Sequence, residues 1–276
     1  PAHRRGWAFG VHRAADTAGA VVGLLVTLWV VDTTQGGGLT LEGPTFHRLV
    51  LWSLVPAALA VLLLAAGARD VPATDGAAPP PRISLRALGP GFGAFVLASA
   101  VFQLGNYSDA FLILRAQERG LGVMGLLWML LAFNVVYTAV SAPAGSLADR
   151  VPRKWVVLGG WCVYAAVYLG FALAQTTTQV VLLFAAYGVY QGMVAGAAKA
   201  MVADLVPPEL RGTAFGTYDA VIGLLSLPAS LLAGLLWQGF AGWNGFGPAA
   251  PFAFGAALAG VAAIMLAVAV PARGGR

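Results

Sequence analysis

The chain has 276 residues, of which 59% are hydrophobic and 10% are charged, and its mean hydropathy is +0.80. A soluble domain carries roughly 25% charged residues, so this composition excludes an ordinary soluble protein and is typical of one that lies in a lipid bilayer. The net charge of +5 comes largely from basic residues that flank apolar stretches, so we expect contact with anionic lipid headgroups and no nucleic-acid partner.

Eight apolar stretches are long enough to cross the hydrocarbon layer, which takes about 20 helical residues. They lack the two-residue alternation of a membrane β-strand, so we predict an all-α membrane bundle. The predicted spans are Ala14–Thr34, Leu49–Ala68, Gly91–Leu114, Leu121–Pro143, Trp155–Ala174, Val180–Val202, Thr217–Trp237 and Ala249–Val270.

Charged residues gather at the start of the first span. Arg13 and Asp16 lie next to His12 and are three residues apart, a spacing at which two side chains pair on a helix. Further along this span, Gly19 and Gly23 form a G-x-x-x-G pattern, which permits close approach of another helix.

One segment, RDVPATDGAAPPPRISLR, has the composition of a linker. Its run of prolines at 79–81 is incompatible with a continuous helix. We therefore divide the chain into two spans at residues 1–68, a cytoplasmic linker at 69–90 and six spans at 91–276.

Polar side chains inside three of the spans need a reason, because a charged group in the bilayer costs about 2.5–3.5 kcal/mol on insertion scales. The candidates are Gln103, Asn106, Tyr107 and Asp109 in the third span, Asn134 and Tyr137 in the fourth, and Tyr187, Tyr190 and Gln191 in the sixth. In one interpretation they bind a solute, and Asp109 carries a proton. In the other they bond across helices at about 0.6 kcal/mol each, and Asp109 pairs with Arg115.

The stretch GSLADRVPRK concentrates four charges between Asp149 and Lys154. If it is cytoplasmic, twelve Lys and Arg residues lie on that side and three on the other, as the positive-inside rule requires. The twelve are Arg4, Arg5, Arg13, Arg69, Arg82, Arg86, Arg150, Arg153, Lys154, Arg211, Arg273 and Arg276, and the three are Arg48, Arg115 and Arg119. We therefore expect both ends of the chain to be cytoplasmic.

The pattern R-G-x-A-F-G occurs twice, from Arg5 and from Arg211, and each copy leads into an apolar span. The second copy opens the fifth of the six spans after the linker, whereas the first opens the first of two spans before it. We therefore expect four further spans before this sequence, in a protein with two homologous six-helix halves. The eight spans would then be helices 5 to 12 of a twelve-helix fold.

The motif G-x-x-x-D-R-x-x-R-K resembles the cytoplasmic signature of the Major Facilitator Superfamily, although proline stands at 152 where the superfamily usually has glycine. The segments LGNYSDAFLILRAQ and PPELRGTAFG also resemble a bacterial branch of it. The resemblance covers essentially the whole chain and implies a helical bundle of this superfamily in the plasma membrane, the bacterial inner membrane. Antiporters of the superfamily often carry Gly-Pro in the first span here, whereas Leu24 follows Gly23.

The resemblance also implies a breakable cytoplasmic gate. Asp149 would face the amino end of a helix of the other half, around Arg5–Gly10, where the helix dipole favours negative charge by about 0.3–1 kcal/mol. The alternatives are that the motif charges only fix the orientation in the membrane, and that Arg13 and Asp16 only pair locally. The gate candidates are Gly145, Asp149, Arg150, Arg153, Lys154, Arg5, Arg13, Asp16 and Arg211.

Together these features predict a secondary transporter that moves a small organic solute by alternating access. Because the sequence has no nucleotide-binding loop, we expect an ion gradient, carried by protons, to supply the energy. We expect no enzymatic activity, no cofactor, no metal and a monomeric full-length protein. The alternative is a non-transporting membrane sensor or scaffold, or an inert remnant of a transporter.

Overall fold

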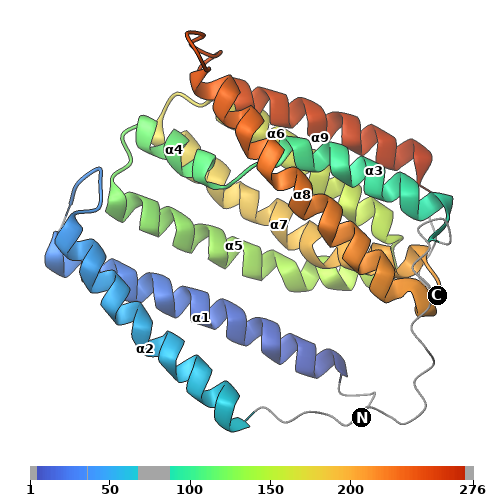
Figure 1. Ribbon diagram of the computed structural model, residues 1–276, viewed down its shortest axis with the longest axis horizontal. Helices are drawn as coiled ribbons and strands as arrows, with labels where there is room; N and C mark the ends of the chain where they lie inside the picture. Colours follow the sequence, from blue (N-terminus) through green and yellow to red (C-terminus); the bar gives the residue numbers. More distant parts are fainter. Residues whose placement is uncertain (1–4, 36, 68–87, 271–276) are drawn as a thin grey trace. The chain divides into compact units, whose positions relative to one another are not determined.

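The computed structural model describes residues 5–35, 37–67 and 88–270, with the backbone alone described for residues 5–15. These residues form α-helices joined by turns and loops (Figure 1). An isolated β-bridge joins Phe240 and Trp243. The helices are α1 (Arg5–Thr34), α2 (Gly43–Gly67), α3 (Gly89–Gly105), α4 (Ala110–Glu118), α5 (Val123–Arg150), α6 (Arg153–Leu173), α7 (Thr177–Leu205), the 3₁₀ turn η3 (Pro208–Leu210), α8 (Arg211–Gln238) and α9 (Ala250–Ala269).

Six helical segments of the described chain are long and apolar enough to cross a membrane: α2, α5, α6, α7, η3 with α8, and α9. Residues Ala18–Thr34 of α1 form a shorter apolar helix. The predicted all-α membrane bundle is therefore confirmed. The predicted linker falls largely on residues 68–87, which lie outside the described residues.

The helices fall into two compact units. The first unit contains α1, α2 and the first turns of α5, Gly122–Trp128. Trp29 of α1 meets Trp52 of α2 edge to face, with ring centroids 5.9 Å apart. The backbone N–H of Val123 donates to the carbonyl of Gly38 at 2.9 Å, which ties the start of α5 to the turn between α1 and α2.

The second unit contains α3, α4, the rest of α5, and α6 to α9. Its core is aromatic: Tyr164 and Tyr168 of α6 are fully buried, with ring centroids 3.9 Å apart, and Phe252 of α9 packs beside them. Close helix contact depends on small residues, because a Cβ atom added at Gly255 of α9 would lie 2.7 Å from the carbonyl oxygen of Gly105 in α3. This core forms a rigid support for the polar residues described below.

The third predicted span is not one helix. We predicted a continuous helix over Gly91–Leu114, but α3 ends at Gly105 and α4 begins at Ala110. The sequence between them, Asn106–Asp109, contains Asn, Ser and Asp, whose side chains compete with the helix for backbone hydrogen bonds. The Ser108 hydroxyl, for example, accepts from the N–H of Ala110 at 3.3 Å. The polar residues that were predicted inside one continuous helix therefore lie at or beside a helix break.

The fourth predicted span is too short. It was predicted to end at Pro143, but α5 continues through this proline to Arg150. A proline removes one helical hydrogen bond, and membrane helices tolerate this where other groups satisfy the backbone. The charged motif therefore straddles a helix junction, with Asp149 and Arg150 in the last turn of α5 and Arg153 and Lys154 in the first turn of α6.

Candidate functional site

A cavity of about 500 Å³ lies at the break between α3 and α4, and we call it the polar cavity. Its lining comes from the break itself and from α7 and α8, all within the second unit. The lining residues are Gln103, Asn106, Tyr107, Ser108, Asp109, Tyr187, Gln191, Ser226, Leu227 and Ser230. Non-helical backbone at membrane depth is tolerated where it borders protein or a water-filled cavity. The cavity therefore accounts for how the chain can leave the helical conformation at this point.

Hydrogen bonds hold the free backbone of the break in place. Gln103 donates from its side-chain amide to the carbonyl of Asn106 at 2.9 Å. The N–H of Ser108 donates to the hydroxyl of Ser230 at 3.3 Å, and the hydroxyl of Tyr164 donates to the carbonyl of Gly105 at 2.7 Å. Side chains thus replace bonds that a continuous helix would have made itself.

The carboxylate of Asp109 is the one charged group among the described residues that line the polar cavity. The hydroxyl of Tyr187 donates to its Oδ1 at 2.9 Å, and the side-chain amide of Gln191 approaches the Tyr187 hydroxyl at 3.4 Å. These three groups form a short chain of polar atoms along one side of the cavity. Such a chain holds the carboxylate in place while leaving it accessible, since Asp109 is an exposed residue.

The structure separates the nine predicted cavity residues into three groups. Six line the polar cavity, and Tyr190 lines an adjoining cavity. The remaining two, Asn134 and Tyr137 of α5, are not among the lining residues of either; the amide of Asn134 donates to the carbonyl of Leu130 in its own helix. Sequence reasoning missed Ser108, Ser226 and Ser230, because single serines are common in membrane helices and carry little signal.

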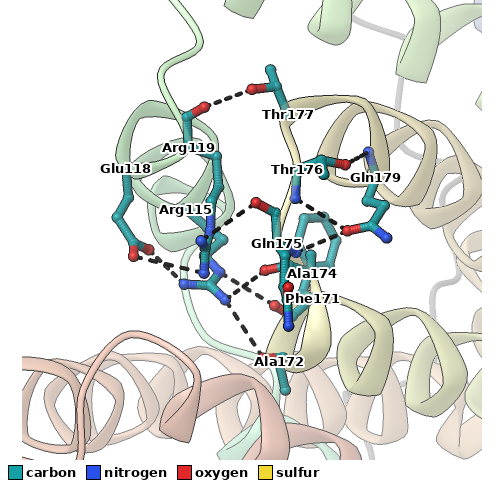
Figure 2. Close-up of polar contacts among 10 residues, drawn as sticks. All are labelled: Arg115, Glu118, Arg119, Phe171, Ala172, Ala174, Gln175, Thr176, Thr177 and Gln179. Carbon is teal, nitrogen blue, oxygen red and sulfur yellow. Dashed lines mark hydrogen bonds and ion pairs between the residues drawn. The ribbon is translucent and has the colours of Figure 1, made fainter.

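The alternative partner proposed for Asp109 is engaged elsewhere. The guanidinium of Arg115 bonds to Glu118 at 2.6 Å and to carbonyl oxygens at the end of α6 (Figure 2). Those carbonyls belong to Phe171 at 3.2 Å and Ala174 at 3.1 Å. Arg115 is 2% exposed, so it closes the carboxyl end of α6 as a buried cap. The interpretation in which Asp109 simply pairs with Arg115 is therefore wrong.

The same cluster fixes the turn between α6 and α7. The hydroxyl of Thr177 donates to the carbonyl of Arg119 at 2.5 Å (Figure 2). Thr176 and Gln179 form a capping box at the start of α7, in which each side chain bonds to the backbone of the other. The carboxyl end of α4 is thereby attached to the turn between α6 and α7.

The motif charges at the α5–α6 junction divide into two pairs. Arg153 forms an ion pair with Asp204 of α7 at 2.5 Å, and Lys154 donates to the carbonyls of Ala267 and Val270 at the end of α9, at 2.8 and 2.5 Å. Asp149 and Arg150 are exposed, and neither forms an ion pair with another described residue. Arg153 and Lys154 therefore hold α6 to α7 and α9, whereas Asp149 and Arg150 remain exposed at the surface.

The remaining gate candidates are Gly145, Asp16, Arg211, Arg5 and Arg13. Gly145 and Asp16 are exposed, and the guanidinium of Arg211 donates to the carbonyl of Ala203 at 3.3 Å. The side chains of Arg5 and Arg13 lie outside the described residues.

The sequence profile of the Major Facilitator Superfamily matches residues 91–275. This chain belongs to the Major Facilitator Superfamily. The match covers every residue that lines the polar cavity. It also confirms the resemblance drawn from the charged motif and identifies a multi-pass membrane protein of a transporter superfamily.

Relatives within this superfamily are similar over different lengths. An uncharacterized transporter of the superfamily from Methanocaldococcus jannaschii is 34% identical over 95% of this chain and 63% of its own length. Multidrug resistance protein 3 of Bacillus subtilis is 30% identical over 40% of this chain and 21% of its own, and multidrug resistance protein MdtG of Proteus mirabilis is 36% identical over 40% and 28%. The chain thus spans less than two thirds of the length of these relatives.

Proposed function

We propose that the protein is a secondary active transporter that moves a small organic solute by alternating access, with the polar cavity as part of the solute site. The observation that carries this proposal is the break at Asn106–Asp109, which places polar side chains and unwound backbone beside a 500 Å³ cavity in an otherwise apolar bundle. Broken helices that present half-helix ends to a cavity are a recurrent way for transporters to bind solutes.

Protons are the proposed coupling ion, and Asp109 is the proposed carrier. A carboxylate inside a membrane protein costs about 2.5–3.5 kcal/mol on insertion scales, so one that serves no structural ion pair needs another use. Asp109 forms no ion pair with a described residue, and its carboxylate accepts a hydrogen bond from the hydroxyl of Tyr187. Movement of a proton on and off this group would change the charge of the cavity by one unit.

The exposed pair at the end of α5 is the proposed cytoplasmic gate. Because Arg153 and Lys154 have partners within the second unit, Asp149 and Arg150 are the motif charges left to make and break contacts as the protein changes state. An exposed charge at a helix end contributes about 0.3–1 kcal/mol, which biases two conformations without locking either.

The remaining assignments follow from the repeat and the basic residues. We propose that α1 and α2 end the first half of a twelve-helix protein, that residues 91–276 form the second half, and that both ends face the cytoplasm. The protein would act as a monomer in the cell membrane, with lipid and its solute as partners and without enzymatic activity.

Proteoliposome experiments on the product of the complete gene test the transport proposal. Counterflow of labelled solutes from a broad panel should identify at least one that exchanges across the membrane. The Asp109→Asn variant should then retain solute exchange but lose uptake driven by a pH gradient, because the amide of asparagine does not bind and release a proton. The Glu42→Gln variant removes an exposed carboxyl between α1 and α2 and should behave as the parent does. If no solute of the panel exchanges across the membrane although one still binds to the protein, the transport proposal fails and a sensor function is favoured.

A further inference from the structure

The charge of the polar cavity has one sign among the described residues that line it, because its one charged group is the carboxylate of Asp109. Basic side chains of the second unit are engaged elsewhere: Arg115 bonds to the end of α6 and Lys154 to the end of α9. Lys199 lies twelve residues beyond Tyr187 on α7, about 18 Å along the helix. The carboxylate therefore attracts a positively charged solute and repels an anion.

The side-chain amide of Gln103 presents a hydrogen-bond acceptor to this cavity. Its NH₂ group must face the carbonyl oxygen of Asn106, to which it donates at 2.9 Å, because a carbonyl oxygen can only accept. The other end of the amide, Oε1, makes no hydrogen bond to a described residue. This oxygen is not one of the fully enclosed polar atoms, so it keeps accessible surface although the residue is only 7% exposed. It is therefore free to accept from a solute.

The direction of a second pair of hydrogen bonds makes Gln191 an acceptor too. The hydroxyl of Tyr187 has a single proton, which it donates to Oδ1 of Asp109 at 2.9 Å. The Tyr187 oxygen must therefore accept from the NH₂ group of Gln191, which approaches it at 3.4 Å. The Oε1 atom of Gln191 bonds to no described residue and is left to accept from a solute. The ionised carboxylate thus fixes the orientation of two neighbouring side chains.

The other polar groups of the lining do not oppose this pattern. The side chains of Asn106, Ser108 and Ser230 can each donate as well as accept, so they adapt to either kind of solute group. Ser226 donates to a backbone carbonyl of its own helix at 2.7 Å, which leaves its oxygen to accept. Leu227 is the one aliphatic side chain among the described lining residues. The groups whose direction is fixed are therefore acceptors.

We infer that the solute is a hydroxylated organic cation. Its ammonium group binds to Asp109, and its hydroxyl groups donate to the amide oxygens of Gln103 and Gln191. An ammonium group has three donors and no acceptor, and each hydroxyl adds a donor, so such a solute matches an acceptor-rich cavity. The volume of about 500 Å³ lies in the usual range of small-molecule sites, about 300–1,000 Å³. The inference rests on the proposed function in one respect, that the polar cavity is part of the solute site.

A lipophilic cation is a poorer match for the same cavity. It would pair with Asp109, but its alkyl chain would displace water from the two amide oxygens without replacing the hydrogen bonds that water makes. Displacing ordered water with a group that cannot reproduce its hydrogen bonds lowers affinity. The cavity should therefore distinguish two amines of equal length by their hydroxyl groups.

Equilibrium binding to the purified product of the complete gene in lipid nanodiscs tests the inference. The labelled probe is glucamine, a linear amine with a fully hydroxylated chain, and three competitors have the same chain length. Hexylamine lacks the hydroxyl groups and should bind about 4- to 140-fold more weakly by free concentration, the effect of two hydrogen bonds of about 2- to 12-fold each. Sorbitol lacks the ammonium group and should bind at least about 10-fold more weakly than glucamine. Gluconate carries a carboxylate instead and should not compete.

Two variants assign the contacts. Gln191→Met should weaken glucamine binding by about 2- to 12-fold and change hexylamine binding by less, because only glucamine has a donor for the lost oxygen. Asp109→Asn should weaken both amines by about 10-fold, so its solute exchange is measured at saturating concentrations. Gln238→Met is the matched control, because Gln238 is exposed at the end of α8 and does not line the polar cavity. Size-exclusion chromatography and circular dichroism check that each variant is folded.

The inference is overturned if the folded protein does not bind glucamine, if hexylamine binds as tightly as glucamine, or if gluconate or sorbitol does. The proposed transport function fails separately. Glucamine bound with the expected pattern but not exchanged across proteoliposomes would leave the solute class standing and remove transport. Exchange of a neutral or anionic solute, with no binding of glucamine, would leave transport standing and remove the solute class.

Discussion

Substitution of Lys154 by methionine should destabilise the second unit through the carboxyl end of α9. The ammonium of Lys154 donates to the carbonyls of Ala267 and Val270, and the residue is 7% exposed. Methionine fills a similar volume but has no donor, so the two carbonyl groups would lose their partner. The variant therefore isolates the hydrogen bonds from the packing.

The size of the effect follows from two opposing contributions. A hydrogen bond to a charged group contributes about 1.5–3 kcal/mol, so the two bonds together stabilise by about 3–6 kcal/mol. Burial of the ammonium group opposes this by several kcal/mol. Favourable interaction of the cation with the helix dipole adds about 0.3–1 kcal/mol. We expect a net loss in unfolding free energy of about 2 kcal/mol.

Equilibrium unfolding in mixed micelles of dodecyl maltoside and sodium dodecyl sulfate, followed by circular dichroism, measures this loss. The matched control is Arg150→Met, which removes an exposed cation four positions earlier and should change the unfolding free energy by less than about 0.5 kcal/mol. Equal effects of the two substitutions would show that Lys154 contributes only charge near the membrane surface, and would refute its role as a cap of α9.

Three further substitutions test contacts of the second unit by the same unfolding measurement. Gly255→Ala places a methyl group against the carbonyl of Gly105 and should destabilise by about 1–3 kcal/mol, whereas an unchanged stability would mean that α3 and α9 can separate freely. Tyr187→Phe removes the bond to Asp109 and should cost about 0.6 kcal/mol, so a loss above about 2 kcal/mol would give this hydroxyl a structural role. Arg115→Met leaves the end of α6 uncapped and should cost at least about 2 kcal/mol, an expectation that a neutral result would contradict.

The fold class could be predicted from the sequence because hydropathy alone decides which segments enter a bilayer. Most positions of the spans followed from the lengths of the apolar runs, but the third span proved to be two helices and the fourth extends to Arg150. The break at Asn106–Asp109 was missed, since four residues of low helix propensity hardly lower the hydropathy of a 24-residue window. The signal was present in the adjacent Gly, Asn, Ser and Asp, each of which favours turns over helix interiors.

Close helix contacts were harder to predict than spans. Gly19 and Gly23 form the recognisable small-residue pattern, yet in the described part of the chain nothing lies within 4 Å of a Cβ added at either. Gly188 and Gly192 of α7, four residues apart in the same way, pack directly on α5, where an added Cβ at Gly188 would lie 2.9 Å from the carbonyl of Phe133. Spacing shows that a close approach is permitted, and the partner helix decides whether it occurs.

The polar residues show the same limit. Asp109, Tyr187 and Gln191 could be selected from the sequence because polar groups inside apolar spans cost free energy. The sequence did not show that hydrogen bonds would link the three side chains to one another. Likewise, the motif predicted a charged junction but not that Arg153 and Lys154 would be held by Asp204 and the end of α9. Such pairings join residues far apart in sequence, and a single sequence contains no direct record of them.

Water access to α8 tests most directly whether the polar cavity is a solute space or merely a set of bonds between helices. In a background in which the single cysteine is replaced by Cys162→Ala, the Ser226→Cys and Leu224→Cys variants place a thiol on nearly opposite sides of one helix. Ser226 lines the polar cavity, whereas Leu224 is 76% exposed and is not among the residues that line it, so we expect lipid to cover it. The thiol introduced at 226 should react with a membrane-impermeant maleimide in sealed vesicles, and the one at 224 should not. Equal labelling of both positions, or labelling at 224 alone, would contradict a water-filled cavity at the α3–α4 break.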